Sequence, residues 1–116
     1  MKIQTEPKAA ATVVSLEGDF VSEADQMALR DEVAVLVGRN EIHIVIDLAG
    51  VKYMNSCGLG SLVCALTKVR KAGGNLCLAR VGDEVAKVIK LTKLDMILHV
   101  YPTVEGALSE VSVHAR

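Results

Sequence analysis

Five short segments of the chain have the composition of β-strands. They are rich in Val, Ile, Leu and Thr and are bounded by Gly, Pro, Asn or Asp. We expect strands at residues 2–5, 10–17, 42–46, 75–79 and 97–100. The first two are expected to form an N-terminal hairpin. The third is apolar at both alternating sets of positions, except at His43, which predicts a central strand covered on both faces.

Four other segments repeat their apolar residues at the spacing of one helix face. We expect helices over residues 22–37, 56–71, 84–91 and 104–111. Ser22 and Asp25 resemble a capping box at the start of the first helix. Asp83 and Thr103 are the expected N-caps of the last two, and the second ends in cations followed by two glycines.

The order of these elements indicates the fold class. A strand at 42–46, a helix at 56–71 and a strand at 75–79 form a strand, helix, strand unit, which implies two parallel strands with a right-handed crossover. Residues 1–116 contain no internal repeat or linker. We therefore expect one α/β domain: a mixed sheet of four to five strands, with an N-terminal hairpin, parallel central strands and about four helices.

Composition and charge exclude several classes of function. The chain has 116 residues, the size of one domain, and 51% of them are hydrophobic. A net charge of −1 and 3% aromatic residues argue against nucleic-acid binding. The longest uncharged run, from Tyr53 to Thr67, is too short to insert into a membrane as a helix. The N-terminus lacks the apolar core of a signal peptide, so we expect a soluble, cytoplasmic protein.

Three cysteines, Cys57, Cys64 and Cys77, are widely spaced and include no C-x-x-C pair. This pattern argues against a disulfide framework and against a zinc site, and it fits a reducing compartment. Cys64 and Cys77 are expected to be small buried side chains. No cofactor or metal is expected.

The connection between the strand ending near Asp47 and the helix opening at Ser56, or at the glycines after it, carries the candidate chemistry. A serine at a helix N-terminus serves as an N-cap, as a small turn residue or as a phosphorylation site. Asp47 is either a turn acceptor or a source of negative charge near Ser56. Gly58 and Gly60 indicate close backbone approach, either by a neighbouring loop or by a partner.

This connection also resembles a known family. The signature of STAS domains, and among them of the bacterial anti-sigma factor antagonists, is an aromatic residue, an aliphatic residue, Asp, Ser, Ser or Thr, and Gly-Leu-Gly. It is similar to the run Tyr53-Met54-Asn55-Ser56-Cys57-Gly58-Leu59-Gly60, entered from Ile44-Val45-Ile46-Asp47-Leu48 and Val51. Two positions depart from it: Asn55 replaces the Asp, which removes a charge, and Cys57 replaces the second hydroxyl residue. The resemblance implies that Ser56 is the phosphoacceptor.

The same resemblance implies a function. An anti-sigma factor antagonist binds an anti-sigma factor with serine kinase activity and so releases a sigma factor. Phosphorylation of the antagonist weakens the binding, and a serine phosphatase reverses the modification. The implied partner-binding residues are Asn55, Ser56, Cys57, Gly58, Leu59 and Gly60. The chain would thus be a phosphorylation-regulated partner-switching protein and not an enzyme.

Two other functions remain open. Asn55 favours a constitutive STAS subunit of a transporter ATPase complex or of a signalling scaffold, without phosphoswitching. An enzyme with Ser56 or Cys57 as nucleophile would need a base, and the histidines lie in no recognisable triad: His43, His99 and His114. The glycines are followed by no Lys-Ser or Lys-Thr, so a P-loop is not indicated.

Overall fold

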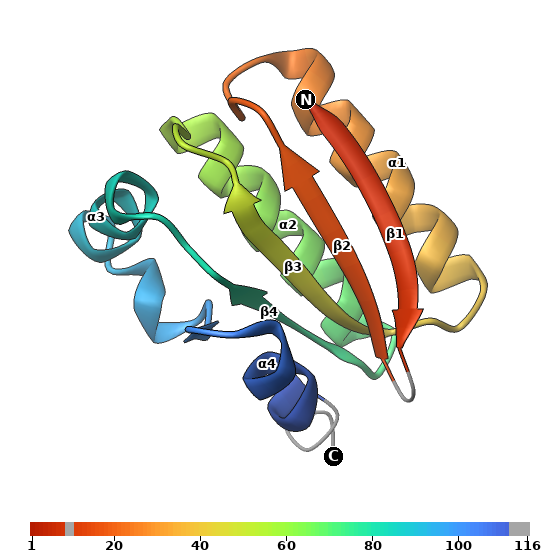
Figure 1. Ribbon diagram of the computed structural model, residues 1–116. Helices are drawn as coiled ribbons and strands as arrows, with labels where there is room; N and C mark the ends of the chain where they lie inside the picture. Colours follow the sequence, from red (N-terminus) through yellow and green to blue (C-terminus); the bar gives the residue numbers. More distant parts are fainter. Residues whose placement is uncertain (9–10, 112–116) are drawn as a thin grey trace.

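A five-stranded mixed sheet organises the molecule (Figure 1). The computed structural model describes residues 1–8 and 11–111. The strands lie in the order β1-β2-β3-β4-β5, with β1 antiparallel to β2 and the other neighbouring pairs parallel. Their bounds are Lys2–Lys8 (β1), Ala11–Glu17 (β2), His43–Gly50 (β3), Asn75–Ala79 (β4) and Val100–Tyr101 (β5).

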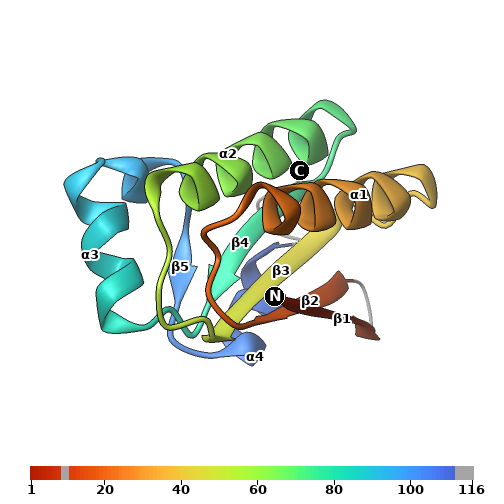
Figure 2. The same cartoon turned by 90° about the horizontal axis from the view of Figure 1, so that it is seen from above.

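Helices cover both faces of this sheet (Figure 2). Helices α1 and α2 lie side by side on one face, and α4 lies on the other, against β3 and β4. Helix α3 joins the core of the first face beyond α2. The bounds are Glu23–Gly38 (α1), Ser56–Lys71 (α2), Asp83–Leu91 (α3) and Val104–Val111 (α4), with a short 3-10 helix, η1, at Leu94–Met96.

The alternation of side chains along β3 explains why this strand is apolar at consecutive positions from Ile44 to Ile46. Ile44 and Ile46 belong to the core beneath α1 and α2. Val45 belongs to a smaller core beneath α4, together with Ala107 and Val111 of that helix. The predicted central strand, covered on both faces, is therefore confirmed.

Most predicted elements are present, with differences at their ends. The capping box of α1 is confirmed, and β4 has the predicted bounds. Strand β1 continues through Pro7 to Lys8, because an edge strand tolerates the missing N–H. The cap of α3 is Gly82, whereas Asp83 is its first helical residue.

Two further predicted ends were wrong. Strand β3 does not close at Asp47 but continues to Gly50, which pairs with Glu17 after an irregularity in β2. The last strand begins at Val100 and not at residue 97, because the chain before it forms η1 and buries Leu98 in the core. Residues 9–10 of the predicted hairpin and His114 lie outside the described residues.

Candidate functional site

The loop that joins β3 to α2 is fixed by the loop that joins β2 to α1. The Phe20 N–H donates to the Tyr53 carbonyl at 3.0 Å, and the Asn55 N–H donates to the Phe20 carbonyl at 3.4 Å. Phe20 and Met54 pair as an isolated parallel bridge, and both side chains are buried. The start of α2 is therefore held by residues more than thirty positions earlier in the chain.

Asn55 is the N-cap of α2 and uses both ends of its amide. Its Oδ1 accepts the Gly58 N–H at 2.9 Å, and its Nδ2 donates to the Val21 carbonyl at 3.0 Å. The Gly58 N–H requires an oxygen as its acceptor, which places the NH₂ group against Val21. An aspartate could cap the helix but could not donate to this carbonyl. The replacement of the family's Asp by Asn55 thus allows a hydrogen bond to Val21 that an aspartate cannot form.

Because Asn55 is the cap, Ser56 is the first residue of α2 and not its cap. Its side chain is exposed, and its hydroxyl has no hydrogen-bond partner among the described residues. Cys57, the next residue, is an exposed free thiol. Tyr53, which is 57% exposed, and Val21 present further apolar surface next to this turn.

The next two residues of the motif point into the fold. A Cβ atom on Gly58 would lie 2.5 Å from the Phe20 carbonyl oxygen and 3.0 Å from the Met54 side chain. Leu59 is 1% exposed and belongs to the main core. Of the two explanations for Gly58, close approach by a neighbouring loop is therefore the one that applies. Neither residue offers a side chain to a partner.

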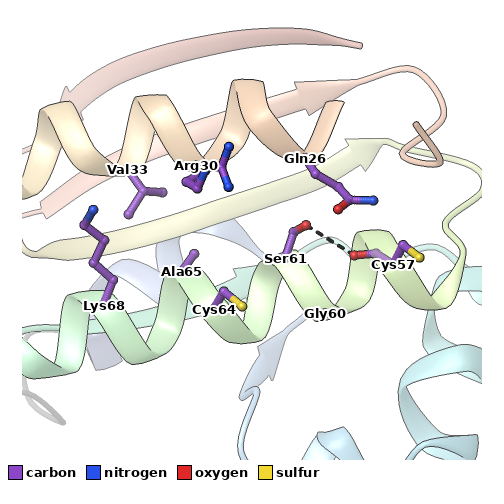
Figure 3. Close-up of a pocket in the computed structure, with 9 residues that line it drawn as sticks. All are labelled: Gln26, Arg30, Val33, Cys57, Gly60, Ser61, Cys64, Ala65 and Lys68. Atoms are coloured by element: carbon purple, nitrogen blue, oxygen red, sulfur yellow. Dashed lines mark hydrogen bonds between the residues drawn. The ribbon is translucent and has the colours of Figure 1, made fainter. Parts of the chain in front are cut away.

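Gly60 differs from Gly58, since a Cβ atom there would have no neighbour within 4 Å. It is exposed and lines a groove of about 360 Å³ between α1 and α2 (Figure 3). This interhelical groove starts at Cys57, next to Ser56, and runs along α2. Its lining residues are Gln26, Arg30 and Val33 from α1, and Cys57, Gly60, Ser61, Cys64, Ala65 and Lys68 from α2.

Asp47 has a structural role in which its charge is paired. Its buried carboxylate forms an ion pair with Arg80, whose Nε donates to Oδ1 at 3.0 Å. This hydrogen bond, with the charge of Asp47, raises the pKa of Arg80. Asp47 also accepts the Ala49 N–H at 3.2 Å, as a turn acceptor does. Sequence reasoning missed Arg80, because 33 positions separate the two residues.

The cysteines and His43 occupy three kinds of environment. Cys77 is buried as predicted, and burial raises the pKa of its thiol to about 12. Cys64 is exposed, so its predicted burial was wrong: it lies on the groove side of α2. His43 is partly buried, and its Nδ1 has no partner among the described residues.

Residues 1–8 and 11–111 contain no group of three or more His, Cys, Asp or Glu side chains arranged to hold a metal ion. No helix within these ranges has the length and apolar character needed to cross a membrane.

Comparison with known proteins decides the family. The model of the STAS domain family matches residues 2–107, which is most of the chain. The chain belongs to the STAS domain family. The five-stranded mixed sheet and four helices of this STAS domain are also those of its structural neighbours, so the predicted fold class is confirmed.

Sequence relatives of this STAS domain include anti-sigma factor antagonists. The anti-sigma F factor antagonist of Paenibacillus polymyxa is 24% identical over 97% of each chain. A Thermotoga maritima protein, provisionally named as an anti-sigma factor antagonist, is 35% identical over 74 residues, 64% of each chain. The match to this second relative therefore spans just under two thirds of its length.

Solved structures extend the likeness to three dimensions. An anti-sigma factor antagonist from Mycobacterium paratuberculosis has a TM-score of 0.83 and 28% identity, over 95% of this chain and 92% of that one. The Bacillus cell fate determinant SpoIIAA, in its phosphorylated form, has a TM-score of 0.72 and 18% identity, over 95% of this chain and 99% of that one. At this identity the second likeness concerns the fold alone.

Proposed function

We propose that this STAS domain is an anti-sigma factor antagonist regulated by phosphorylation of Ser56. In the unphosphorylated form it binds an anti-sigma factor with serine kinase activity, and the anti-sigma factor releases a sigma factor. The kinase transfers the γ-phosphoryl group of ATP to the Ser56 hydroxyl, which loses its proton. A serine phosphatase hydrolyses the phosphoester and restores the binding form. The proposal assigns no catalytic reaction to this chain.

The observation that carries the proposal is the position of the Ser56 hydroxyl. A kinase needs an acceptor oxygen that solvent can reach and that the fold does not require. Asn55 caps α2, so the Ser56 hydroxyl has no structural task within the described residues. The serine is exposed at a βα junction fixed by hydrogen bonds to the preceding loop. Phosphorylation can therefore change the surface and leave the fold intact.

The start of α2 also provides a favourable environment for the phosphate. Asn55 occupies the N–H of Gly58, which leaves the N–H groups of Ser56 and Cys57 available to an anion. The helix dipole places partial positive charge at the same end, and α2 has no acidic residue in its first turn. A phosphate with about −1.5 to −2 charges would thus be tolerated by the domain. It would weaken a partner interface by repulsion and desolvation.

The surface that we assign to the partner is smaller than the motif. It comprises Asn55, Ser56, Cys57 and Gly60 from the predicted set, with Tyr53 exposed beside them. Gly58 and Leu59 are left out, because they pack against the neighbouring loop and the core. Their part in binding is to hold the exposed residues in place.

Binding and phosphate transfer test this function in one experiment. The protein is titrated with its cognate anti-sigma kinase in a calorimeter, as wild type and as the variants Ser56→Asp and Ser56→Ala. We expect Ser56→Asp to weaken binding about tenfold or more, because a carboxylate imitates part of the phosphate charge. Ser56→Ala should bind as the wild type does and take up no phosphate from ATP.

A matched control uses another hydroxyl of the same helix, outside the groove lining. Thr67→Asp places the same charge about three turns further along α2, where the exposed threonine donates to the Val63 carbonyl at 3.0 Å, and should bind as the wild type does. Equal affinities of Ser56→Asp and Ser56→Ala would reject the switch. Phosphate incorporation into Ser56→Ala, mapped by peptide mass spectrometry, would reject Ser56 as the acceptor.

The alternative function, a constitutive STAS subunit without phosphoswitching, was favoured by Asn55 in place of the family's Asp. The local structure gives another reason for this asparagine. Its NH₂ group donates to the Val21 carbonyl, which the family's Asp cannot do. The loss of the carboxylate therefore does not require the loss of the switch. If native Ser56 is never phosphorylated in the cell, and pull-down recovers a membrane-complex ATPase instead of a kinase, the constitutive function is the correct one.

A further inference from the structure

We propose that the interhelical groove between α1 and α2 receives an amphipathic helix of the anti-sigma factor, with small apolar residues on its inner face and Asp or Glu at its sides. This inference rests on the proposed function and goes beyond it. It names a second contact, distinct from Ser56, and the chemistry of the segment that makes it.

Gly60 is the first observation that points to an occupant. A glycine inside a helix costs about 1 kcal/mol relative to alanine. Gly58 has an internal reason for this cost, since a Cβ atom would collide with the Phe20 carbonyl. Gly60 has none, because a Cβ atom there would have no neighbour within 4 Å. A glycine that the fold does not require, on the wall of a groove, permits the close approach of a second backbone.

The shape of the groove favours a helix over an extended segment. The groove side of α2 carries small residues over about two and a half turns: Cys57, Gly60, Ser61, Cys64 and Ala65. Both walls are helices, whose backbone groups are paired internally, so an extended segment would find no backbone partners there. A helix pairs its own backbone groups. Small side chains at this spacing let two helices approach closely.

The charges on the groove walls indicate which residues flank the apolar face of the bound helix. Arg30 on α1 and Lys68 on α2 line opposite walls, and neither has an ion-pair partner among the described residues. Figure 3 shows Lys68 extending from α2 towards Val33 of α1. Val33 and Ala65 line the groove, are both buried and form its apolar floor. An apolar floor between two unpaired cations is complementary to an apolar helix face flanked by carboxylates. No acidic residue lines the groove.

The native thiols report whether the groove is filled. Cys57 lies beside Ser56, whereas Cys64 lies about two turns further along the groove. We expect saturating anti-sigma kinase to slow the alkylation of Cys64 by iodoacetamide about tenfold or more, as measured by peptide mass spectrometry. Cys77 is the internal control, because it is buried and its thiol pKa is about 12 in the free protein.

Two pairs of variants test the contact by calorimetric titration. Gly60→Leu fills the groove and should weaken binding about tenfold or more, whereas Gly38→Leu, at an equally open glycine at the end of α1, should not. Lys68→Glu should weaken binding about threefold or more at low salt. Lys71→Glu makes the same change in the same last turn of α2, outside the groove lining, and should have a smaller effect.

The outcomes separate the inference from the proposed function. A complex that forms and weakens with Ser56→Asp, while Cys64 stays freely reactive and Gly60→Leu binds as the wild type does, would overturn the groove contact alone. Failure of the wild type to bind the kinase at all would overturn the proposed function, and the groove contact with it. Protection of Cys64 together with the loss of affinity in Gly60→Leu would support the contact.

Discussion

The N-terminal end of α2 has two sides with different roles: one packs against the rest of the fold, and the other faces solvent. On the inner side, Gly58 and Leu59 pack against Phe20, Met54 and the core. On the outer side, Ser56, Cys57 and Gly60 are exposed, and their side chains contribute little to packing. The two sets alternate within five residues. One motif therefore carries two kinds of constraint: the inner side positions the turn, and the outer side is available for binding.

Leu59→Ala should produce the largest loss of stability. The side chain is 1% exposed, so its truncation leaves a cavity in the main core. We expect the free energy of unfolding, measured by urea denaturation, to fall by about 3 kcal/mol. Leu91→Ala is the matched control, because Leu91 is 83% exposed and should cost less than about 0.5 kcal/mol. Similar losses for both leucines would contradict the division into two sides.

Gly58→Ala should produce the second-largest loss, about 2 kcal/mol in the free energy of unfolding measured by urea denaturation. The added Cβ atom would lie 2.5 Å from a backbone oxygen, which must shift with its loop. This cost exceeds the gain of about 1 kcal/mol in helix propensity. A stabilised Gly58→Ala variant would show that the β2–α1 loop is not fixed against the turn.

Asn55→Ala should lower the free energy of unfolding by about 1 to 2 kcal/mol, because it removes the cap and leaves the Val21 carbonyl without its donor. Asn55→Asp keeps the acceptor for the Gly58 N–H and should fall between the wild type and Asn55→Ala. Thermal unfolding by circular dichroism measures both. Equal stability of the wild type and Asn55→Asp would mean that the bond to Val21 contributes nothing.

Gly60→Ala should produce the smallest change, with the opposite sign. A Cβ atom there would have no neighbour within 4 Å, so helix propensity alone acts. We expect a gain of about 0.5 to 1 kcal/mol in the free energy of unfolding. This variant and Gly58→Ala make the same chemical change two residues apart. A loss of stability in Gly60→Ala would remove the argument that its glycine serves a partner.

The sequence predicted the local parts of the site more fully than their surroundings. Helix α2, a start at or soon after Ser56 and the capping box of α1 follow from residues within one or two turns of each other. The exposure of Cys64 and the different roles of Gly58 and Gly60 could not be predicted, because both depend on where α1 and the Phe20 loop lie relative to α2. A helix pattern identifies the core side, but it does not say which outer positions border a groove.

The helices and strands and their order follow from local patterns in the chain, because periodicity, caps and glycine stops act over a few residues. Three features exist only in the folded chain: Asp47 pairs with Arg80, Asn55 donates to Val21, and a groove opens beside Ser56. These contacts join residues that only the packed sheet and helices bring together. Their geometry depends on the whole fold and is absent from any short window of the chain.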